Sequence, residues 1–200
     1  MVDFFTFITP TVCVITCNTA HKRLSSYMNK KSELYKVFID IRLPVFDYMN
    51  RIDSDFVITG TNGTTGVGLQ KHEIGLYADH KQKVGGIKSQ IIVNTLEQQD
   101  IIISAIVDIK AGQFDNDNDC NVCDGKEYSS TKYALMKKKF NPKQRILSIA
   151  NEMRIKVGSN VPVVLGCTEL PLPFSDMELE EHNLIDPTQL LGEYVKRKLV

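Results

Sequence analysis

The chain has 200 residues, and its 24 Lys and Arg residues balance its 24 Asp and Glu residues. This length suits one domain or two small lobes, and a chain of this size buries on the order of 70% of its unfolded surface. The balanced charge gives no reason to expect nucleic acid or an anionic membrane as a partner. No apolar run is long enough to span a bilayer, and the apolar start lacks the basic residues of a signal peptide.

Five cysteines occur at irregular spacing, at Cys13, Cys17, Cys120, Cys123 and Cys167. An odd number of cysteines in a chain of this length is not typical of a disulfide framework. The sequence therefore predicts a cytoplasmic protein with free thiols available for chemistry.

The first half of the chain favours short strands, because it contains several runs rich in β-branched residues. The strands are expected over residues 11–16, 35–41, 55–61 and 88–93. Residues 18–28 are predicted to be helical, so Cys17 lies at a turn from strand to helix. A Gly/Thr-rich loop, GTNGTTGVG, follows the third strand.

The second half favours helices. Residues 93–112 predict a helix because apolar residues recur at helical spacing, and Gly112 is placed to end it. Further helices are expected over residues 144–157 and 186–199, with Thr188 as the N-cap of the last helix.

The order of these elements defines the fold class. An apolar run over residues 161–166 predicts a fifth strand, which ends at Cys167. Strands that alternate with helices imply an α/β fold with mostly parallel sheets flanked by helices. Ligands bind at the carboxyl ends of the strands in such sheets, where Cys17 and Thr61 are also expected.

Residues 113–139 interrupt this pattern and predict an inserted surface loop. The loop begins Asn/Asp-rich, ends Lys-rich and contains a single Cys-x-x-Cys pair, Cys120 and Cys123. A zinc site usually needs four ligands, and a calcium loop needs Gly and Glu where this chain has Cys120 and Lys126. We therefore predict a solvated loop without a metal, with a reversible disulfide or a weak metal site as the open alternative.

Two cysteines follow predicted strands in similar settings, Cys17 in CNT and Cys167 in GCTE. Each thiol can carry a proton, and the Asn and Thr side chains and helix-start N–H groups beside it suit a bound carboxylate. A single cysteine at a strand end is most often a small buried hydrophobe, which is the structural alternative. Two matching settings 150 residues apart favour a shared function.

The segments CNTAH and GCTELPLP resemble the paired signatures of the aspartate/glutamate racemase family, the cofactor-independent amino-acid racemases. The segments VITGTNGT, IKAG and LIDPTQLL resemble further parts of that family, so the resemblance covers most of the chain outside residues 113–139. It implies two pseudo-symmetric α/β lobes with the active site between them. Because family members have a longer segment before the first cysteine motif, it also implies a truncated first lobe.

On this resemblance, residues 1–52 and 186–200 would form the remnant of the first lobe, and residues 53–185 the second. The truncated lobe would leave strand edges and apolar surface exposed, which pairing with a second copy in a homodimer would cover. The resemblance implies no other partner than a small-molecule amino acid, with no nucleic acid and no membrane.

The resemblance implies racemisation of aspartate or glutamate without pyridoxal phosphate or a metal, so no cofactor is expected. One of the thiols of Cys17 and Cys167 would remove the α-proton while the opposing thiol delivers a proton to the other face. The alternatives are an inactive racemase-like protein that binds a dicarboxylate and a related thiol-dependent isomerase.

The family motifs also imply the substrate-binding residues. The substrate would be held by Asn18, Thr19, Thr61 and Thr168. Lys110 would meet its side-chain carboxylate, although a lysine is also favoured simply as a cation at a helix C-terminus. Glu169 would orient a backbone or ammonium group, or serve only as a polar residue at a helix start.

Overall fold

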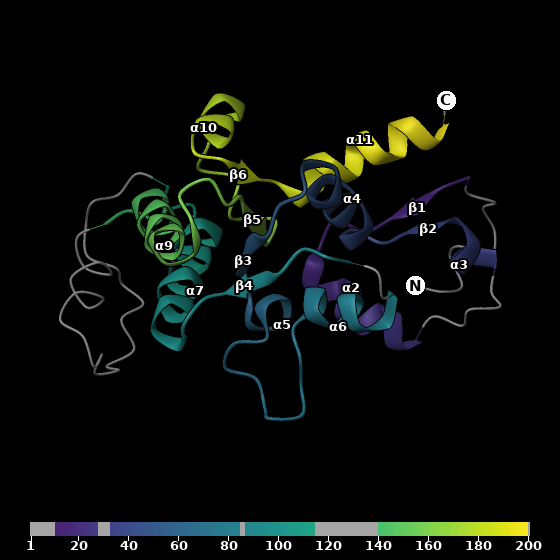
Figure 1. Ribbon diagram of the computed structural model, residues 1–200, viewed down its shortest axis with the longest axis horizontal. Helices are drawn as coiled ribbons and strands as arrows, with labels where there is room; N and C mark the ends of the chain where they lie inside the picture. The colour runs from purple at the N-terminus through teal and green to yellow at the C-terminus, as the bar shows by residue number, and fades with distance from the viewer. Residues whose placement is uncertain (1–10, 28–32, 85–86, 115–139, 200) are drawn as a thin grey trace.

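The computed structural model describes residues 11–27, 33–84, 87–114 and 140–199. Its strands are β1 (Cys13–Val14), β2 (Phe38–Ile39), β3 (Phe56–Gly60), β4 (Ile91–Val93), β5 (Val163–Gly166) and β6 (Leu184–Ile185). They form a central four-stranded sheet in the order β4-β3-β5-β6 and a separate pair, β1-β2, toward one end of the molecule (Figure 1). All of these strands pair in parallel, so the predicted α/β fold class with parallel sheets is confirmed.

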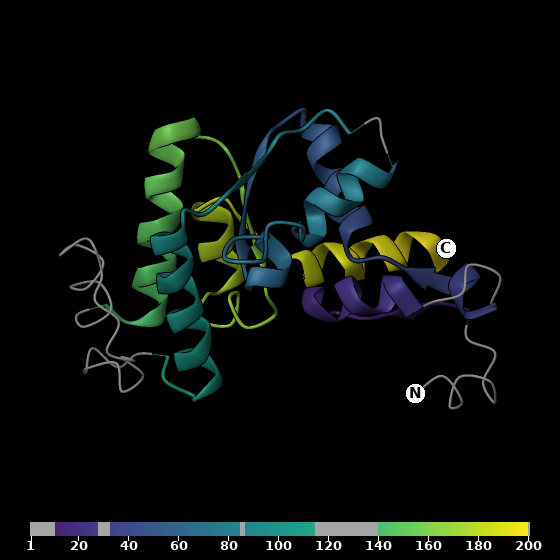
Figure 2. The ribbon, with the colours of Figure 1, turned by 90° about the horizontal axis from the view of Figure 1, so that it is seen from below.

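Helices cover both faces of the four-stranded sheet. Their bounds are α2 (Asn18–Tyr27), α3 (Glu33–Val37), α4 (Arg42–Ile52), α5 (Asn62–Thr65), α6 (Leu76–Val84), α7 (Leu96–Lys110), α9 (Pro142–Val157), α10 (Asp176–Glu181) and α11 (Pro187–Leu199). Helices α7 and α9 lie on one face, α4 and α6 lie on the other, and α11 packs on α4 (Figure 2).

Strand β3 is covered on both faces of the sheet, because all of its residues are buried. Val57 points into the cluster formed with α7 and α9, whereas Phe56 and Ile58 point into the cluster formed with α4 and α6. Successive side chains of a strand face opposite sides, and strands buried on both faces are near-continuous apolar runs in sequence. The run DFVITGT therefore predicted this central strand correctly.

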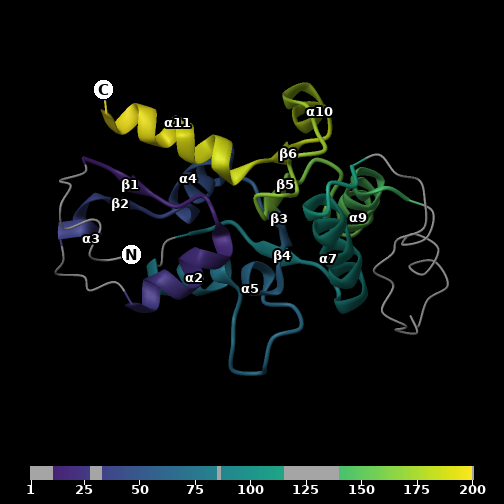
Figure 3. The ribbon, with the colours of Figure 1, turned by 180° about the vertical axis from the view of Figure 1, so that it is seen from behind.

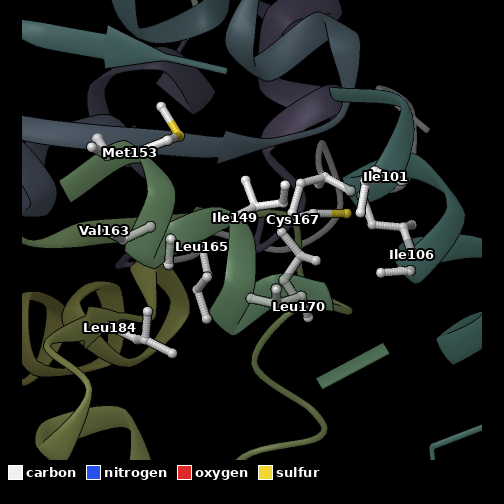
Figure 4. Close-up of a cluster of buried hydrophobic side chains, with 14 of the residues drawn as sticks. Ile101, Ile106, Ile149, Met153, Val163, Leu165, Cys167, Leu170 and Leu184 are labelled. Carbon is white, nitrogen blue, oxygen red and sulfur yellow. The ribbon is translucent and has the colours of Figure 1, made fainter. Parts of the chain in front are cut away.

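The cluster on the α7 and α9 side reaches the end of β5. Figure 4 shows Leu165 among the apolar side chains of the cluster, with Cys167 beside Ile149, Ile101 and Leu170. Cys167 is only 7% exposed, so its thiol is packed into the apolar layer rather than open to water.

Helices α7 and α9 confirm the predictions for residues 93–112 and 144–157, and both begin with a capping box. In α7 the Thr95 side chain accepts from the Gln98 N–H while the Gln98 side chain accepts from the Thr95 N–H, so two otherwise unpaired donors are satisfied. Gly112 has a φ of +76° just after α7, as expected of a glycine that ends a helix.

The first two predicted strands are shorter than expected. The strand over residues 11–16 is reduced to β1, in which Val14 is 40% exposed. The strand over residues 35–41 is reduced to β2, because residues 33–37 form α3 instead. β1 and β2 pair only with each other among the described strands, so neither is enclosed in a wider ladder that would favour longer pairing.

The N-cap prediction for the last helix is wrong. Thr188 lies inside α11, and its backbone N–H donates to Asp186 Oδ1 at 2.8 Å. The carboxylate of Asp186 therefore satisfies the helix start, and Pro187 occupies the first helical position, where a missing N–H costs nothing.

The predicted division into two lobes stays a prediction. Helices α4 and α11 fall in the ranges assigned to the first lobe, and α4 packs on the four-stranded sheet through Val45, Phe46 and Met49. Residues 115–139, with Cys120 and Cys123, lie outside the described part of the chain. Within the described part, no helix has the length and apolar character needed to cross a membrane.

A buried ion pair between α7 and α9 gives a stability prediction. Arg145 donates to Asp108 Oδ2 at 2.7 Å, and both side chains are at most 3% exposed. Asp108→Ala should lower the free energy of unfolding by about 3–5 kcal/mol, because it leaves the guanidinium buried without its counter-charge. Urea denaturation measures this change.

The control is the double variant Asp108→Leu/Arg145→Met, which removes both charges and should recover most of the loss. A loss below about 1 kcal/mol in the single variant would contradict the role given to the pair.

Candidate functional site

The candidate site lies where β3 and β5 end. Gly60 and Gly166 are paired in register at the ends of these strands. A Cβ atom on Gly60 would lie 2.7 Å from the Gly166 carbonyl oxygen, and one on Gly166 would lie 2.6 Å from Thr64 Cγ2. Only glycine fits at both places, so these residues allow the Gly/Thr loop to approach the chain just before Cys167.

A chain of hydroxyl groups crosses this site. Thr19 Oγ1 lies 2.9 Å from Thr61 Oγ1, which lies 3.1 Å from Thr64 Oγ1. Thr64 then donates to the Gly166 carbonyl at 3.0 Å. The contacts join the start of α2 to the residue before Cys167, and α2 packs beside α5 and α6 (Figure 3). Thr19 and Thr61, predicted from different motifs, are thus brought together.

Cys17 and Asn18 lie at the start of α2. Cys17 is exposed, and its carbonyl accepts from the His21 N–H at 3.3 Å, as the residue before a helix does. Asn18 is buried, and its Oδ1 accepts from the Tyr77 hydroxyl at 3.0 Å. Burial raises the pKa of Tyr77, so its hydroxyl keeps the proton that it donates. The bond from Tyr77 therefore fixes the orientation of the Asn18 amide at the start of α2.

Cys167 forms a second group with Glu169, Lys110 and Thr168. Cys167 Sγ donates to Glu169 Oε2 at 2.7 Å, Thr168 Oγ1 donates to the same oxygen at 3.0 Å, and Lys110 Nζ lies 3.2 Å from Glu169 Oε1. Three predicted residues, Cys167, Thr168 and Lys110, thus contact the Glu169 carboxylate. Lys110 reaches it from the end of α7.

The electrostatics of this group keep Cys167 protonated. Burial, and then the hydrogen bond to the Glu169 carboxylate, raise the pKa of Cys167 to about 12. Burial alone would raise the pKa of Glu169, but the donors Cys167 and Lys110 outweigh it and hold that pKa below its ordinary value. At neutral pH the group therefore consists of a neutral thiol, a carboxylate and an ammonium group.

The surroundings of Lys110 raise its pKa. The bond to Glu169 raises the pKa of Lys110, and smaller contributions come from Cys167 and Cys17.

A polar network of His21, Asp40 and Arg42 holds α2 in place. His21 Nε2 lies 2.6 Å from the Ile15 carbonyl oxygen, and His21 Nδ1 lies 3.6 Å from Asp40 Oδ1. Burial lowers the pKa of His21, so the ring is neutral at pH 7 and donates to Ile15, two residues before Cys17. Asp40 in turn pairs with Arg42, whose Nε donates to Asp40 Oδ1 at 2.8 Å. His21 thus links α2 to the segment just before Cys17 and to Asp40.

Sequence reasoning missed the residues that position the site. Thr64, Tyr77 and Asp40 contact predicted residues or the segments that carry them, and Arg42 holds Asp40 in place. The TNGTT run was the available signal for Thr64. The other three had none, because a buried polar residue is identified only by its partner in space.

No family model and no curated protein matches the chain. Among the described residues, no group of three or more His, Cys, Asp or Glu side chains is arranged to hold a metal ion.

The difference between the thiols gives a testable prediction. With a pKa of about 12, Cys167 is a thiolate in only about one molecule in ten thousand at pH 8. Iodoacetamide at pH 8 should therefore label Cys167 far more slowly than exposed Cys17, as measured by mass spectrometry of each peptide over time. Glu169→Gln removes a charge that raises this pKa, so it should speed the labelling of Cys167 several-fold.

Glu181→Gln, an exposed glutamate on α10, is the matched control and should leave the labelling of Cys167 unchanged. Equal labelling rates for Cys17 and Cys167 in the native protein would contradict the assignment.

Proposed function

We propose that the protein is a cofactor-independent racemase of aspartate or glutamate, built from two pseudo-symmetric lobes. The observation that supports this proposal best is the chain of hydroxyl groups from Thr19 through Thr61 and Thr64 to the Gly166 carbonyl, because it connects the two segments that carry Cys17 and Cys167. The convergence of Cys167, Thr168 and Lys110 on the Glu169 carboxylate supports it further, because it places an ammonium group and a thiol in one group of contacts.

The reaction would use the two thiols in opposite protonation states. Cys17 as a thiolate takes the α-proton from one face of the substrate, and the electron pair of the broken C–H bond stays on the α-carbon, delocalised into the carboxylate. Cys167 then donates its S–H proton to the opposite face, which forms the new C–H bond and leaves Cys167 as the thiolate. The reverse direction starts from that second state.

The surroundings of Cys167 suit the role of proton donor. A thiol whose pKa is about 12 keeps its proton in the resting protein, so it is available when the carbanion forms. A thiolate beside Glu169 would be destabilised by like charge, and Lys110 lies where it offsets part of that repulsion. The raised pKa therefore favours return of a proton to Cys167.

The substrate carboxylates would meet two groups of donors. The Thr19 and Thr61 hydroxyls and the first N–H groups of α2 suit the α-carboxylate. Lys110 suits the side-chain carboxylate, because its side chain is 57% exposed and can exchange Glu169 for an incoming acid. This pairing favours acidic amino acids over neutral ones.

One observation favours a second function, an inactive racemase-like protein that binds a dicarboxylate. The Cys167 side chain is packed into the apolar cluster and is only 7% exposed, whereas a base must touch its substrate. Under this alternative, Lys110 and the Thr hydroxyls bind the ligand, and no proton leaves the α-carbon.

The test is exchange of solvent deuterium into the α-position of L- and D-aspartate and of L- and D-glutamate under reducing conditions. The native protein should exchange at least one pair, and Cys17→Ser and Cys167→Ser should each lower the rate by about 10²–10⁴-fold. Cys13→Ser, a change in the nearby strand β1, is the control and should retain the rate.

Absence of exchange in the native protein would overturn the racemase proposal. Calorimetry with L-aspartate then tests the alternative, since binding without exchange supports it and turnover excludes it.

A further inference from the structure

We infer that Gln99 is a positioning residue for the candidate site: it fixes the Gly60–Thr65 segment so that Thr61 presents its hydroxyl to the substrate. This inference rests on the proposed function, because it assumes that Thr61 contacts a substrate.

Gln99 is 1% exposed on α7, and its amide bonds to both ends of this segment. Its Nε2 donates to the Gly60 carbonyl at 2.6 Å and to Asn62 Oδ1 at 3.1 Å. Its Oε1 accepts from Thr65 Oγ1 at 3.1 Å and from Asn94 Nδ2 at 3.1 Å. A glutamine amide has two N–H donors and one acceptor oxygen with two lone pairs, so these four contacts use its full capacity.

The orientation of the amide follows from its partners. The Gly60 carbonyl can only accept, so Gln99 Nε2 must face it, and Oε1 must then face Thr65 and Asn94. No other natural side chain of this length offers two donors and an uncharged acceptor in one plane. A glutamate would bring an oxygen against the Gly60 carbonyl, and a methionine would lose all four bonds.

The anchored segment carries the site hydroxyls between its ends. Thr61 and Thr64 lie between Gly60 and Thr65, and they bond to Thr19 and to the Gly166 carbonyl. The backbone N–H groups of Thr64 and Thr65 both donate to the Thr61 carbonyl, at 2.9 and 3.0 Å. Loss of the Gln99 bonds would therefore release the backbone that sets the position of Thr61.

Gln98 provides a matched control. It is adjacent on the same helix, is also 1% exposed and also makes side-chain hydrogen bonds. Those bonds go to the Thr95 backbone at 3.0 Å and to Glu152 at 3.2 Å, and none of them reaches the Gly60–Thr65 segment. Gln98→Met and Gln99→Met therefore share the change in side chain and the loss of side-chain hydrogen bonds, but only Gln99→Met removes bonds to the Gly60–Thr65 segment.

The experiment compares the two variants by kinetics and by amide hydrogen exchange. Gln99→Met should raise the KM for the amino acid in the deuterium-exchange assay by about tenfold or more, with a smaller change in kcat, because misplaced substrate ligands weaken binding. Gln98→Met should change KM less than about twofold. The Thr64 and Thr65 amides should exchange at least about tenfold faster in Gln99→Met, and at the native rate in Gln98→Met.

Equal KM values for Gln99→Met and the native protein, or equal increases in both variants, would overturn the inference. If the native protein exchanges no α-proton, the proposed function fails. Amide hydrogen exchange then tests only whether Gln99 holds the Gly60–Thr65 segment in place. Thr64 and Thr65 amide exchange rates that are unchanged in Gln99→Met would overturn that role as well. If Gln99→Met does not fold, Gln99→Glu replaces it, because it keeps the acceptor for Thr65 while losing the donor to Gly60, and the same outcomes apply.

Discussion

The partly buried pair of Asp40 and Arg42 is the interaction on which the arrangement of the site depends. Arg42, at the start of α4, donates to Asp40 through its Nε, its NH2 and its backbone N–H, and its NH1 also donates to the Leu76 carbonyl on α6 at 3.2 Å. Charge-assisted hydrogen bonds with several parallel contacts are the strongest kind, and a buried charge that loses its partner is costly. This pair therefore holds the end of β2 firmly against α4 and α6.

That attachment determines where Cys17 lies. Asp40 faces His21 on α2, and His21 in turn bonds to the Ile15 carbonyl just before Cys17. Tyr77 on α6 reaches the same helix through Asn18. The segment that carries Cys17 is thus tied to the helices that cover the four-stranded sheet, while Cys167 extends from β5 in the centre of that sheet. The relation between the two thiols is set by buried polar contacts rather than by a shared strand pair.

The two thiols occupy different environments, which suits different roles. Cys17 is exposed at a helix start, whereas Cys167 is buried beside a carboxylate and holds its proton. The sequence motifs, CNT and GCTE, presented the thiols as equivalent. The difference comes from packing, because α7 and α9 enclose Cys167, whereas Cys17 is exposed.

Much of the fold could be predicted from the sequence, where a local pattern matched the local structure. β3 and β5 are apolar runs buried on both faces, and α7 and α9 carry both apolar periodicity and caps. Helices α4 and α6 were not predicted, because buried Arg42, Tyr77 and His80 break their apolar pattern.

The site could be predicted only as far as its motifs extend. Thr19, Thr61, Thr168 and Glu169 stand beside recognisable cysteines or in the Gly/Thr loop, and the structure places them in contacting groups. Gln99 could not be found, because its four partners lie on other segments of the chain, with Gly60 39 residues away. A glutamine inside a helix has no sequence signal that distinguishes a buried anchor from a solvated surface residue.

The most direct test of the account is a crystal structure of the protein with a bound dicarboxylic amino acid under reducing conditions. The account predicts the α-carbon between the two sulfur atoms, each within about 3.5 Å of it and on opposite faces. It also predicts one carboxylate at the Thr19 and Thr61 hydroxyls and the other at Lys110. A ligand bound elsewhere, or sulfur atoms too far apart to reach one α-carbon together, would contradict it.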